Sequence, residues 1–262
     1  MQLPTVSEKH QEHDEKLIMR GAVIKLEDVS IYYRFEPDRP ASLKEFVIRT
    51  IKKDIKRQTV RALDGVSFEV QKEEVLGIIG RNGAGKSTLL KLISRIIRPT
   101  QGRVRVWGNV TSLLGVGAGF SHELTGTENI FLYSALLGRS QEQTIDLFEE
   151  IVDFAELEEF IDAPLRTYST GMIARLGFAV AMVETPEILL VDEVLAVGDE
   201  QFQKKCQVRF QDIQSAGATI IIVSHSMTAI TNLCDRALWL AEGKAVRFDY
   251  ARDVVAGYQT SQ

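Results

Sequence analysis

The residues best suited to chemistry form a glycine-rich loop at positions 80–88, which reads Gly-Arg-Asn-Gly-Ala-Gly-Lys-Ser-Thr. Apolar runs on both sides predict that the loop joins a buried strand to a helix. Glycines let backbone N–H groups wrap around phosphate oxygens, and the helix N-terminus adds a partial positive charge. The lysine can reach the β- and γ-phosphates, and the next hydroxyl can ligate Mg²⁺. The pattern predicts a nucleoside triphosphate site formed by Gly80, Asn82, Gly83, Gly85, Lys86, Ser87 and Thr88.

Kinases, GTPases and motor proteins share such a loop, and a chance turn is the other alternative, so further motifs must decide. Residues 188–191 read Ile-Leu-Leu-Val and lead into Asp192 and Glu193, as expected for a buried parallel strand with acids at its carboxyl end. Such acids can support Mg²⁺ and deprotonate the attacking water, in that order. Residues 219–224 predict another buried strand, and we interpret the following His225 as a γ-phosphate contact. A solvated turn for the acids and a structural role for the histidine remain the alternatives.

A serine and a glycine between those strands open a helix that is rich in small residues. The segment 168–172 reads Tyr-Ser-Thr-Gly-Met, and the helical pattern continues to Val183. Taken alone, this segment is typical of an ordinary helix cap. Taken with the strands around it, Ser169 and Gly171 are candidates for the second half of a split ATP site.

The order of these motifs resembles the ATP-binding cassette (ABC) family from about Val23 to Asp249. Residues 80–87 match its Walker A loop, residues 169–172 its signature motif, and residues 189–192 its Walker B strand.

The resemblance also implies roles, cofactors and a partner. It makes Tyr33 the adenine-stacking residue, Glu193 the catalytic base, His225 the switch histidine and Asp199 a D-loop residue. ATP and Mg²⁺ are the implied cofactors, with Ser87 and Asp192 at the metal. The family forms a head-to-tail homodimer, in which each ATP lies between one subunit's Walker motifs and Ser169 and Gly171 of the partner subunit.

Three departures from the common family pattern point to one subfamily. The usual Q-loop glutamine is absent from residues 113–120, so we assign no residue there. Residues 193–199 read Glu-Val-Leu-Ala-Val-Gly-Asp, and Thr170 and Met172 replace a glycine and a glutamine of the signature motif. These features are similar to those of the ABC subfamily that exports O-antigen, teichoic acid and related lipid-linked polymers.

Residues 38–61 form a long insertion where most cassettes have a short hairpin turn. Its pattern predicts a basic amphipathic helix, whose apolar face is formed by Leu43, Phe46, Val47, Ile51 and Ile55. In the resembled exporters an extra helix here lies near the cytoplasmic polymer entrance. Our hypothesis is that it guides an anionic lipid-linked glycan or a phospholipid headgroup, and the alternative is a solvated helix packed on its own domain.

Composition limits the remaining function classes. The chain has 262 residues, and its formal net charge of -5 disfavours a general binder of nucleic acid or anionic membrane. Two cysteines provide no disulfide framework, which favours a reduced cytosolic setting. No apolar stretch is long enough to span a bilayer, and the polar residues 1–21 are expected to form a flexible tail.

The expected fold is α/β, with an ABC-type P-loop ATPase core, an inserted helical subdomain and peripheral antiparallel strands. The ATPase domain is expected to span residues 22–262, and its helical subdomain residues 121–183. Strands are expected near residues 23–33, 66–70, 75–79, 189–192, 219–224, 237–241 and 244–249. Helices are expected after the phosphate loop and the later strands, and at residues 129–137, 141–155, 158–160 and 170–183.

We therefore expect the ATP-hydrolysing subunit of an ABC transporter that exports a lipid-linked polysaccharide or a teichoic-acid-like polymer. It would be held at the cytoplasmic face of the cell membrane by an integral-membrane permease. A transporter for a small molecule or a lipid is the alternative. Three other classes are disfavoured. Chromosome and repair ATPases need a long coiled coil between the two halves of the site, for which this chain has no room, and translation-factor cassettes need two nucleotide units, of which this chain has one. A P-loop kinase needs an acceptor site and would not need the signature, D-loop and histidine motifs in this order. An inactive regulatory subunit would not need Lys86, Asp192, Glu193 and His225 together.

Overall fold

The computed structural model describes residues 21–35, 58–115, 117, 119–192 and 198–261. Nearly all of the expected tail and residues 38–57 of the expected insertion lie outside the described residues. Residues 58–61, the end of that expected insertion, are strand rather than helix, because they pair with the neighbouring strand.

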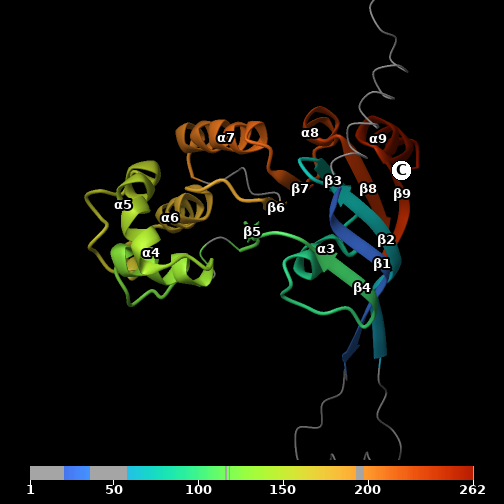
Figure 1. The fold of residues 1–262 in the computed structure, drawn as a ribbon, viewed down its shortest axis with the longest axis horizontal. Coiled ribbons are helices and arrows are strands. Elements are labelled where there is room, and N and C mark those ends of the chain that lie inside the picture. The colour runs from blue at the N-terminus through green and yellow to red at the C-terminus, as the bar shows by residue number, and fades with distance from the viewer. Residues whose placement is uncertain (1–20, 36–57, 116, 118, 193–197, 262) are drawn as a thin grey trace, which may run out of the picture.

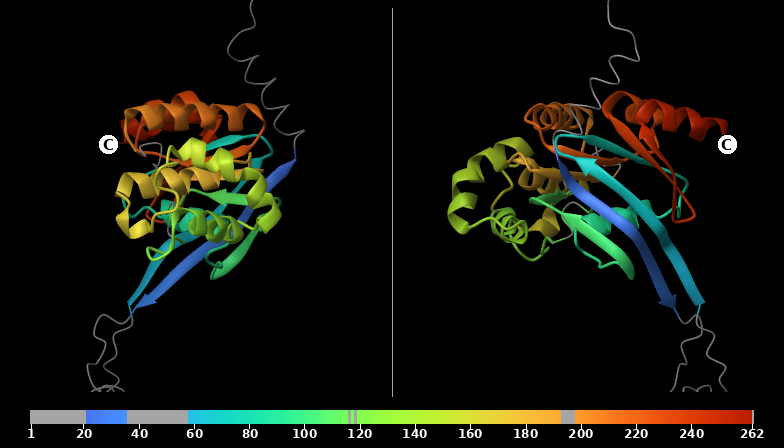
Figure 2. Two further views of the ribbon diagram at one scale, coloured as in Figure 1. Left: turned by 90° about the vertical axis from the view of Figure 1, so that its left-hand side faces the viewer. Right: turned by 45° about the vertical axis from the view of Figure 1, so that its right-hand side comes forward.

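A three-stranded antiparallel sheet in the order β2-β1-β4 covers one side of the molecule, and consists of β1 (Ala22–Phe35), β2 (Gln58–Gln71) and β4 (Gln101–Val106). The pair β1 and β2 continues past the rest of the sheet as a two-stranded ribbon (Figure 2). The ends Phe35 and Gln58 lie at the tip of this ribbon, so the chain between them is attached there.

A six-stranded sheet forms the centre of the protein, in the order β5-β6-β7-β3-β8-β9. All neighbours are parallel except the last pair, which is antiparallel. Its strands are β3 (Val75–Ile79), β5 (Val110–Ser112), β6 (Ile188–Asp192), β7 (Thr219–Val223), β8 (Arg236–Ala241) and β9 (Lys244–Tyr250).

The helices divide into two groups (Figure 1). One group covers the central sheet, and comprises α3 (Lys86–Ile93), α7 (Glu200–Ser215), α8 (Met227–Leu233) and α9 (Ala251–Thr260). The other group forms a helical lobe to one side, and comprises α4 (Gly126–Leu136), α5 (Gln141–Ala155) and α6 (Thr170–Met182). None of the helices in the described part of the chain is both long and apolar enough to cross a bilayer.

Alternating side chains of the central strands enter two different hydrophobic clusters. Leu190 and Ile221 pack with the antiparallel sheet and α3, whereas Leu189 and Ile220 pack with α6, α7 and the helical lobe. The central strands are therefore buried on both faces, which explains their nearly continuous apolar sequences.

Three phenylalanines join the helical lobe to the sheet-covering helices. Phe154 of α5, Phe178 of α6 and Phe202 of α7 have ring centroids 5.7 to 6.1 Å apart. Phe178 and Phe202 are fully buried. Since aromatic rings bury large apolar areas, this cluster makes the lobe part of the same hydrophobic core as the parallel sheet.

The α/β fold is confirmed, with local differences from the sequence prediction. The strands β4 and β5 were not expected, because β4 is a partly exposed edge strand interrupted by charges and β5 has three residues. The helix α9 agrees with the expectation of helices after the later strands, and its apolar side packs on β8 through Tyr258 and its neighbours. Residues 158–160 form a turn rather than the expected helix, because the Phe160 N–H donates to the carbonyl of Leu157.

A buried carboxylate lies at the turn between β2 and β3. Glu74 has no exposed surface, its Oε2 accepts a hydrogen bond of 2.7 Å from the Gln71 N–H, and its Oε1 lies 3.5 Å from the Arg236 guanidinium. Burial raises the pKa of Glu74 from 4.5 to about 7, although the Gln71 N–H and Arg236 act in the opposite direction. The folded protein therefore keeps this proton over a pH range in which the unfolded chain releases it.

We predict that Glu74→Gln removes a pH-dependent part of the free energy of unfolding. A raised pKa contributes stability that is present below pH 4.5 and is lost as the pH rises to about 7. Because each pKa unit corresponds to roughly 1.4 kcal/mol, the wild type should lose about 3 kcal/mol relative to the variant across this window. Urea unfolding at several pH values measures this, with the exposed Glu200→Gln as the control. Parallel pH curves for wild type and Glu74→Gln would contradict the prediction.

Candidate functional site

Three strands bring the candidate residues to one edge of the central sheet. On β7, Val223 pairs with Asp192 of β6 on one side and with Ile78 of β3 on the other. The carboxyl ends of these parallel strands therefore lie at the same level, about two strand spacings of roughly 4.8 Å across. The phosphate loop leaves β3, Asp192 ends β6, and His225 follows β7, so all three meet at this edge.

The phosphate loop requires glycine at two points. Gly85 has φ +105° and precedes α3, and a Cβ there would lie 2.5 Å from the carbonyl oxygen of Ala62. Gly80 has φ +149°, and a Cβ there would collide with the carbonyl oxygen of Leu240. Glycine lets the loop pass between β2 and β8 and still place the α3 N-terminus at the sheet edge.

Lys86, at the start of α3, folds back over the loop. It is largely buried, and its Nζ donates to the carbonyls of Gly80 at 2.7 Å and Arg81 at 3.1 Å. The ammonium group is thus held inside the loop, where a phosphate oxygen would be an additional acceptor. The neighbouring Ser87 and Thr88 lie in the first turn of α3, where backbone N–H groups have no partner within the helix.

Two oxygen donors at this edge suit Mg²⁺. Ser87 supplies a hydroxyl and Asp192 supplies a carboxylate, and hard oxygen ligands are those that Mg²⁺ prefers. Their chemistry therefore fits the ion implied by the sequence. The expected base, Glu193, lies outside the described residues. His225 is exposed at the end of β7, directly before the start of α8.

Tyr33 lies on the ribbon that passes the phosphate loop. Tyr33 pairs with Val60 of β2. Two residues earlier on β1, Ile31 pairs with Leu63, and the Leu63 side chain lies against Gly85 of the loop. The Tyr33 side chain is 45% exposed, so its ring surface is accessible. The stacking role expected for Tyr33 stays a prediction.

The second group of candidate residues lies on the helical lobe. Ser169 is the N-cap of α6 and its Oγ accepts a 3.2 Å hydrogen bond from the Met172 N–H. Among the described residues, a Cβ on Gly171 would meet only the Ser169 hydroxyl at 3.7 Å, so none of them requires glycine there. Asp199 caps α7 beside them, and a cavity of about 660 Å³ opens between residues 169–172 and residues 198–199.

Arg175 links three helices beside the second half-site, a role that its sequence does not indicate. Its guanidinium pairs with Asp199 of the α7 cap and, at 3.2 Å, with Glu156 at the end of α5, and it lies over the Phe202 ring. The Phe202 N–H and the Arg175 charge hold the pKa of Asp199 below its usual value. One side chain therefore ties α5, α6 and the start of α7 together. The only hint in the sequence that Arg175 belongs to this half-site is its position on α6, about one turn after Gly171.

The candidate residues thus form two half-sites on different parts of the chain. The first half-site comprises Gly80, Lys86, Ser87, Asp192 and His225 at the sheet edge. The second half-site comprises Ser169, Gly171 and Asp199, and α6 lies in the lobe to the side of the sheet edge (Figure 1). The two half-sites thus lie at separate places in one copy of the chain, one at the sheet edge and one at the cavity beside α6.

Comparison with known protein families and relatives agrees with these observations. The family model described as ABC transporter matches residues 63–196. The O-antigen export system ATP-binding protein RfbB of Klebsiella pneumoniae is 45% identical over 205 residues, which cover 78% of this chain and 83% of that protein. The teichoic acids export ATP-binding protein TagH of Bacillus cereus is 40% identical over 198 residues, but these cover only 36% of that protein and 76% of this chain.

Solved structures support the fold. A dimeric bacterial ABC transporter cassette, MJ0796, superposes with a TM-score of 0.66 at 22% identity, covering 87% of this chain and 99% of that one. Another ATP-binding subunit of an ABC transporter superposes with a TM-score of 0.69 at 19% identity, covering 90% of this chain and 93% of that one.

We predict that Gly85→Ala abolishes nucleotide binding more strongly than Gly83→Ala. Both residues have positive φ, at +105° and +80°, and a left-handed residue other than glycine costs roughly 1–2 kcal/mol. Only at Gly85 does the added methyl also collide with the Ala62 carbonyl, whereas nothing lies within 4 Å at Gly83. Equilibrium binding of a fluorescent ATP analogue should show a Kd at least about tenfold weaker for Gly85→Ala than for Gly83→Ala. Equal losses would refute the steric argument.

We also predict that Arg175→Gln lowers ATP turnover without changing ATP affinity. The variant loses the links among α5, α6 and α7 but leaves residues 80–88 untouched. Turnover should fall roughly tenfold, because loss of charged hydrogen bonds costs about 1.5–3 kcal/mol. The control is Lys204→Gln, which breaks an exposed pair with Glu200 and should have little effect. Wild-type turnover in Arg175→Gln would exclude a positioning role.

Proposed function

Because this chain belongs to the ABC transporter family, we propose that it is the ATP-hydrolysing subunit of an exporter for a lipid-linked polysaccharide. O-antigen and teichoic-acid-like polymers are the substrate class. The observation that carries this proposal is the identity of 40–45%, over more than three quarters of the chain, with export ATPases of those two systems. A transporter for a small molecule or a lipid remains the second candidate within the family.

The proposed chemistry assigns a task to each residue of the first half-site. The backbone N–H groups of residues 83–88 and the Lys86 ammonium bind the phosphates. Ser87 and Asp192 hold Mg²⁺, which neutralises charge on the phosphates when bound. Glu193 takes a proton from the attacking water, and His225 contacts the γ-phosphate. Tyr33 stacks on the base and fixes the orientation of the nucleotide.

The second half-site serves the other copy in a head-to-tail homodimer. Ser169 and the N–H groups at the start of α6 would donate to the γ-phosphate held by the partner subunit, and Gly171 permits a close approach. Asp199 lies at the seam between the copies. Closure around two ATP molecules and reopening after hydrolysis would then move an integral-membrane permease at the cytoplasmic face of the cell membrane.

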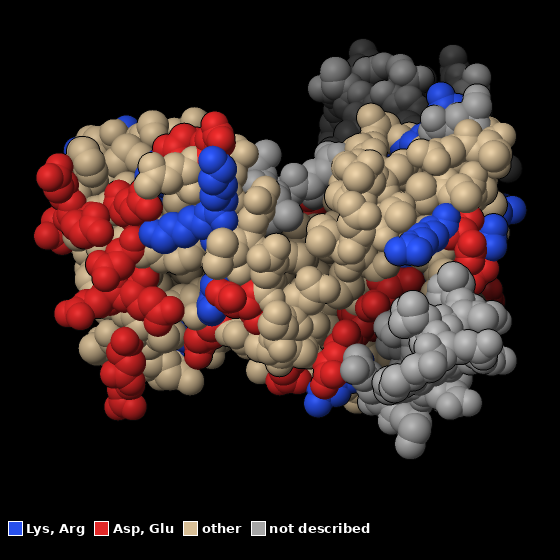
Figure 3. Space-filling view, turned by 90° about the horizontal axis from the view of Figure 1, so that it is seen from above, with Lys and Arg blue, Asp and Glu red and all other residues tan. Residues whose placement is uncertain are grey.

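The distribution of charge favours the insertion over the helical lobe as the contact for an anionic polymer. Acidic side chains gather on the lobe (Figure 3), and Glu149, Glu150 and Asp153 of α5 are exposed there. Such a face repels phosphate-bearing ligands. The basic residues Lys52, Lys53 and Lys56 belong to the insertion at the tip of the β1–β2 ribbon, and their structure lies outside the described residues.

We predict that Glu193→Gln, in the native host, causes a lipid-linked glycan to accumulate on the cytoplasmic side of the membrane. Losing a general base typically costs a factor of about 10² or more in rate. The purified variant should therefore trap ATP in a closed dimer, which size-exclusion chromatography detects. The matched control is Glu200→Gln, an exposed acid in the first turn of α7.

The outcomes separate the enzyme assignment from the substrate assignment. Near-normal ATP turnover in Glu193→Gln would show that the assigned base is wrong. Lost turnover with a normal glycan inventory would exclude polymer export and favour the small-molecule or lipid transporter. In the same assay, reversing the charges of Lys52, Lys53 and Lys56 should impair export with intact ATPase activity, and unchanged export would exclude a guiding role for the insertion.

A further inference from the structure

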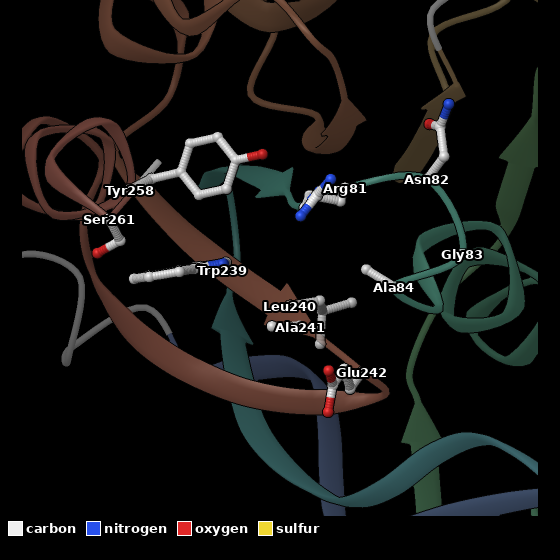
Figure 4. A pocket seen from close by; sticks show the side chains of 10 residues that line it. All are labelled: Arg81, Asn82, Gly83, Ala84, Trp239, Leu240, Ala241, Glu242, Tyr258 and Ser261. Atoms are coloured by element: carbon white, nitrogen blue, oxygen red, sulfur yellow. The ribbon is translucent and has the colours of Figure 1, made fainter.

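A cavity of about 600 Å³ lies behind the phosphate loop, on the side away from β7 (Figure 4). Its walls are residues 81–84 of the loop, residues 239–242 at the end of β8, and Tyr258 and Ser261 at the end of the chain. Ligand pockets in proteins typically have volumes of about 300–1,000 Å³. The cavity is therefore large enough for a small organic molecule.

The hydroxyl of Tyr258 points into this cavity. Tyr258 is 8% exposed, and its hydroxyl makes no hydrogen bond within the described part of the chain. Figure 4 shows that it points toward Arg81 across the cavity. The hydroxyl is thus placed to donate to an acceptor bound in the cavity, and a hydrogen bond to a charged acceptor contributes about 1.5–3 kcal/mol.

Two more donors face the same space. The Arg81 guanidinium is exposed and has no ion pair or hydrogen bond among the described residues. The Trp239 indole packs against the edge of the Tyr258 ring, with centroids 5.4 Å apart, and its N–H also has no partner in the described part of the chain. A guanidinium and two aromatic donors together match an oxyanion, above all a phosphate.

The remaining walls suit a ring that carries hydroxyl groups. The Trp239 ring is half-buried and offers an apolar surface on which the C–H face of a sugar can stack. Glu242 provides an exposed carboxylate at the end of β8, and the Ser261 oxygen can accept while its hydroxyl donates to the Gly257 carbonyl at 2.8 Å. Acceptors near an aromatic surface are what sugar hydroxyls need.

We infer that this cavity binds a phosphorylated sugar, with the phosphate on Arg81 and Tyr258 and the ring against Trp239. The cavity shares Asn82 and Gly83 with the expected nucleotide site, but its lining does not include residues 85–88, Tyr33, Asp192 or His225, so the two ligands would lie on different sides of the loop. It nevertheless adjoins the phosphate loop, since the Gly243 N–H after β8 donates to the Ala84 carbonyl at 3.1 Å. This inference does not depend on the transported cargo.

Tryptophan fluorescence tests the inference on the full chain. The protein has two tryptophans, so Trp107→Phe leaves Trp239 as the only reporter. Glucose 1-phosphate should change the emission saturably, and should do so with ADP saturating the phosphate loop. Glucose should produce no saturable change at the same concentrations, because it lacks the phosphate.

Two variants locate the bound molecule. In the Trp107→Phe background, Tyr258→Phe should weaken glucose 1-phosphate binding about tenfold and Arg81→Gln about tenfold or more, since each removes a hydrogen bond to a charged group. The control Arg98→Gln removes another exposed guanidinium and should leave binding unchanged. Melting temperatures show whether each variant is folded.

Three binding results would overturn the inference, and so would evidence of self-association. They are no saturable response to glucose 1-phosphate, a response lost when ADP is present, and a response unchanged in Tyr258→Phe and Arg81→Gln. A signal that follows protein concentration rather than ligand would also overturn it, because a second copy would then cover the cavity. If glucose 1-phosphate binds, the Kd values of UDP-glucose and of a short-chain prenyl-pyrophosphoryl glucose should then be compared. The lower Kd shows whether the cavity prefers a soluble or a lipid-linked sugar phosphate.

Discussion

The candidate site depends on the parallel pairing of β6, β7 and β3. Because Val223 pairs with both Asp192 and Ile78, the carboxyl ends of three strands that are distant in sequence stop at the same level. This register is enforced by burial, since alternate residues of each strand enter different hydrophobic clusters and a shift by one residue would exchange them. The phosphate loop, the acid at the end of β6 and the histidine after β7 meet as a consequence of core packing.

A second constraint comes from the helical lobe, which shares its core with the sheet through Phe154, Phe178 and Phe202. This cluster and the Arg175 contacts hold Ser169 and Asp199 together as one unit. That unit lies to one side of the sheet edge, so a single copy presents two incomplete sites (Figure 1). The proposed homodimer therefore rests on the packing of the lobe as well as on the motifs.

Much of the first half-site was predictable because its signals are local. The run before Gly80 is apolar and short, which predicts a strand. The spacing of the glycines and the lysine after it predicts a loop that leads into a helix, and this prediction does not depend on distant parts of the chain. The predictions that were wrong concern elements with weak local signals. The edge strand β4 carries charges, and residues 158–160 are too few for a helix.

The sequence by itself determined the ATPase family, the phosphate loop and the identity of the residues expected around the nucleotide, because these depend on residue types at fixed spacing along the chain. Only the tertiary structure decided which groups from distant segments come together. Arg175 meets Glu156 and Asp199, Glu74 is buried beside Arg236, and Tyr258 points toward Arg81 across a cavity. Such contacts arise from the packing of helices on the sheet, and packing is set by all the buried side chains together rather than by any short stretch of sequence.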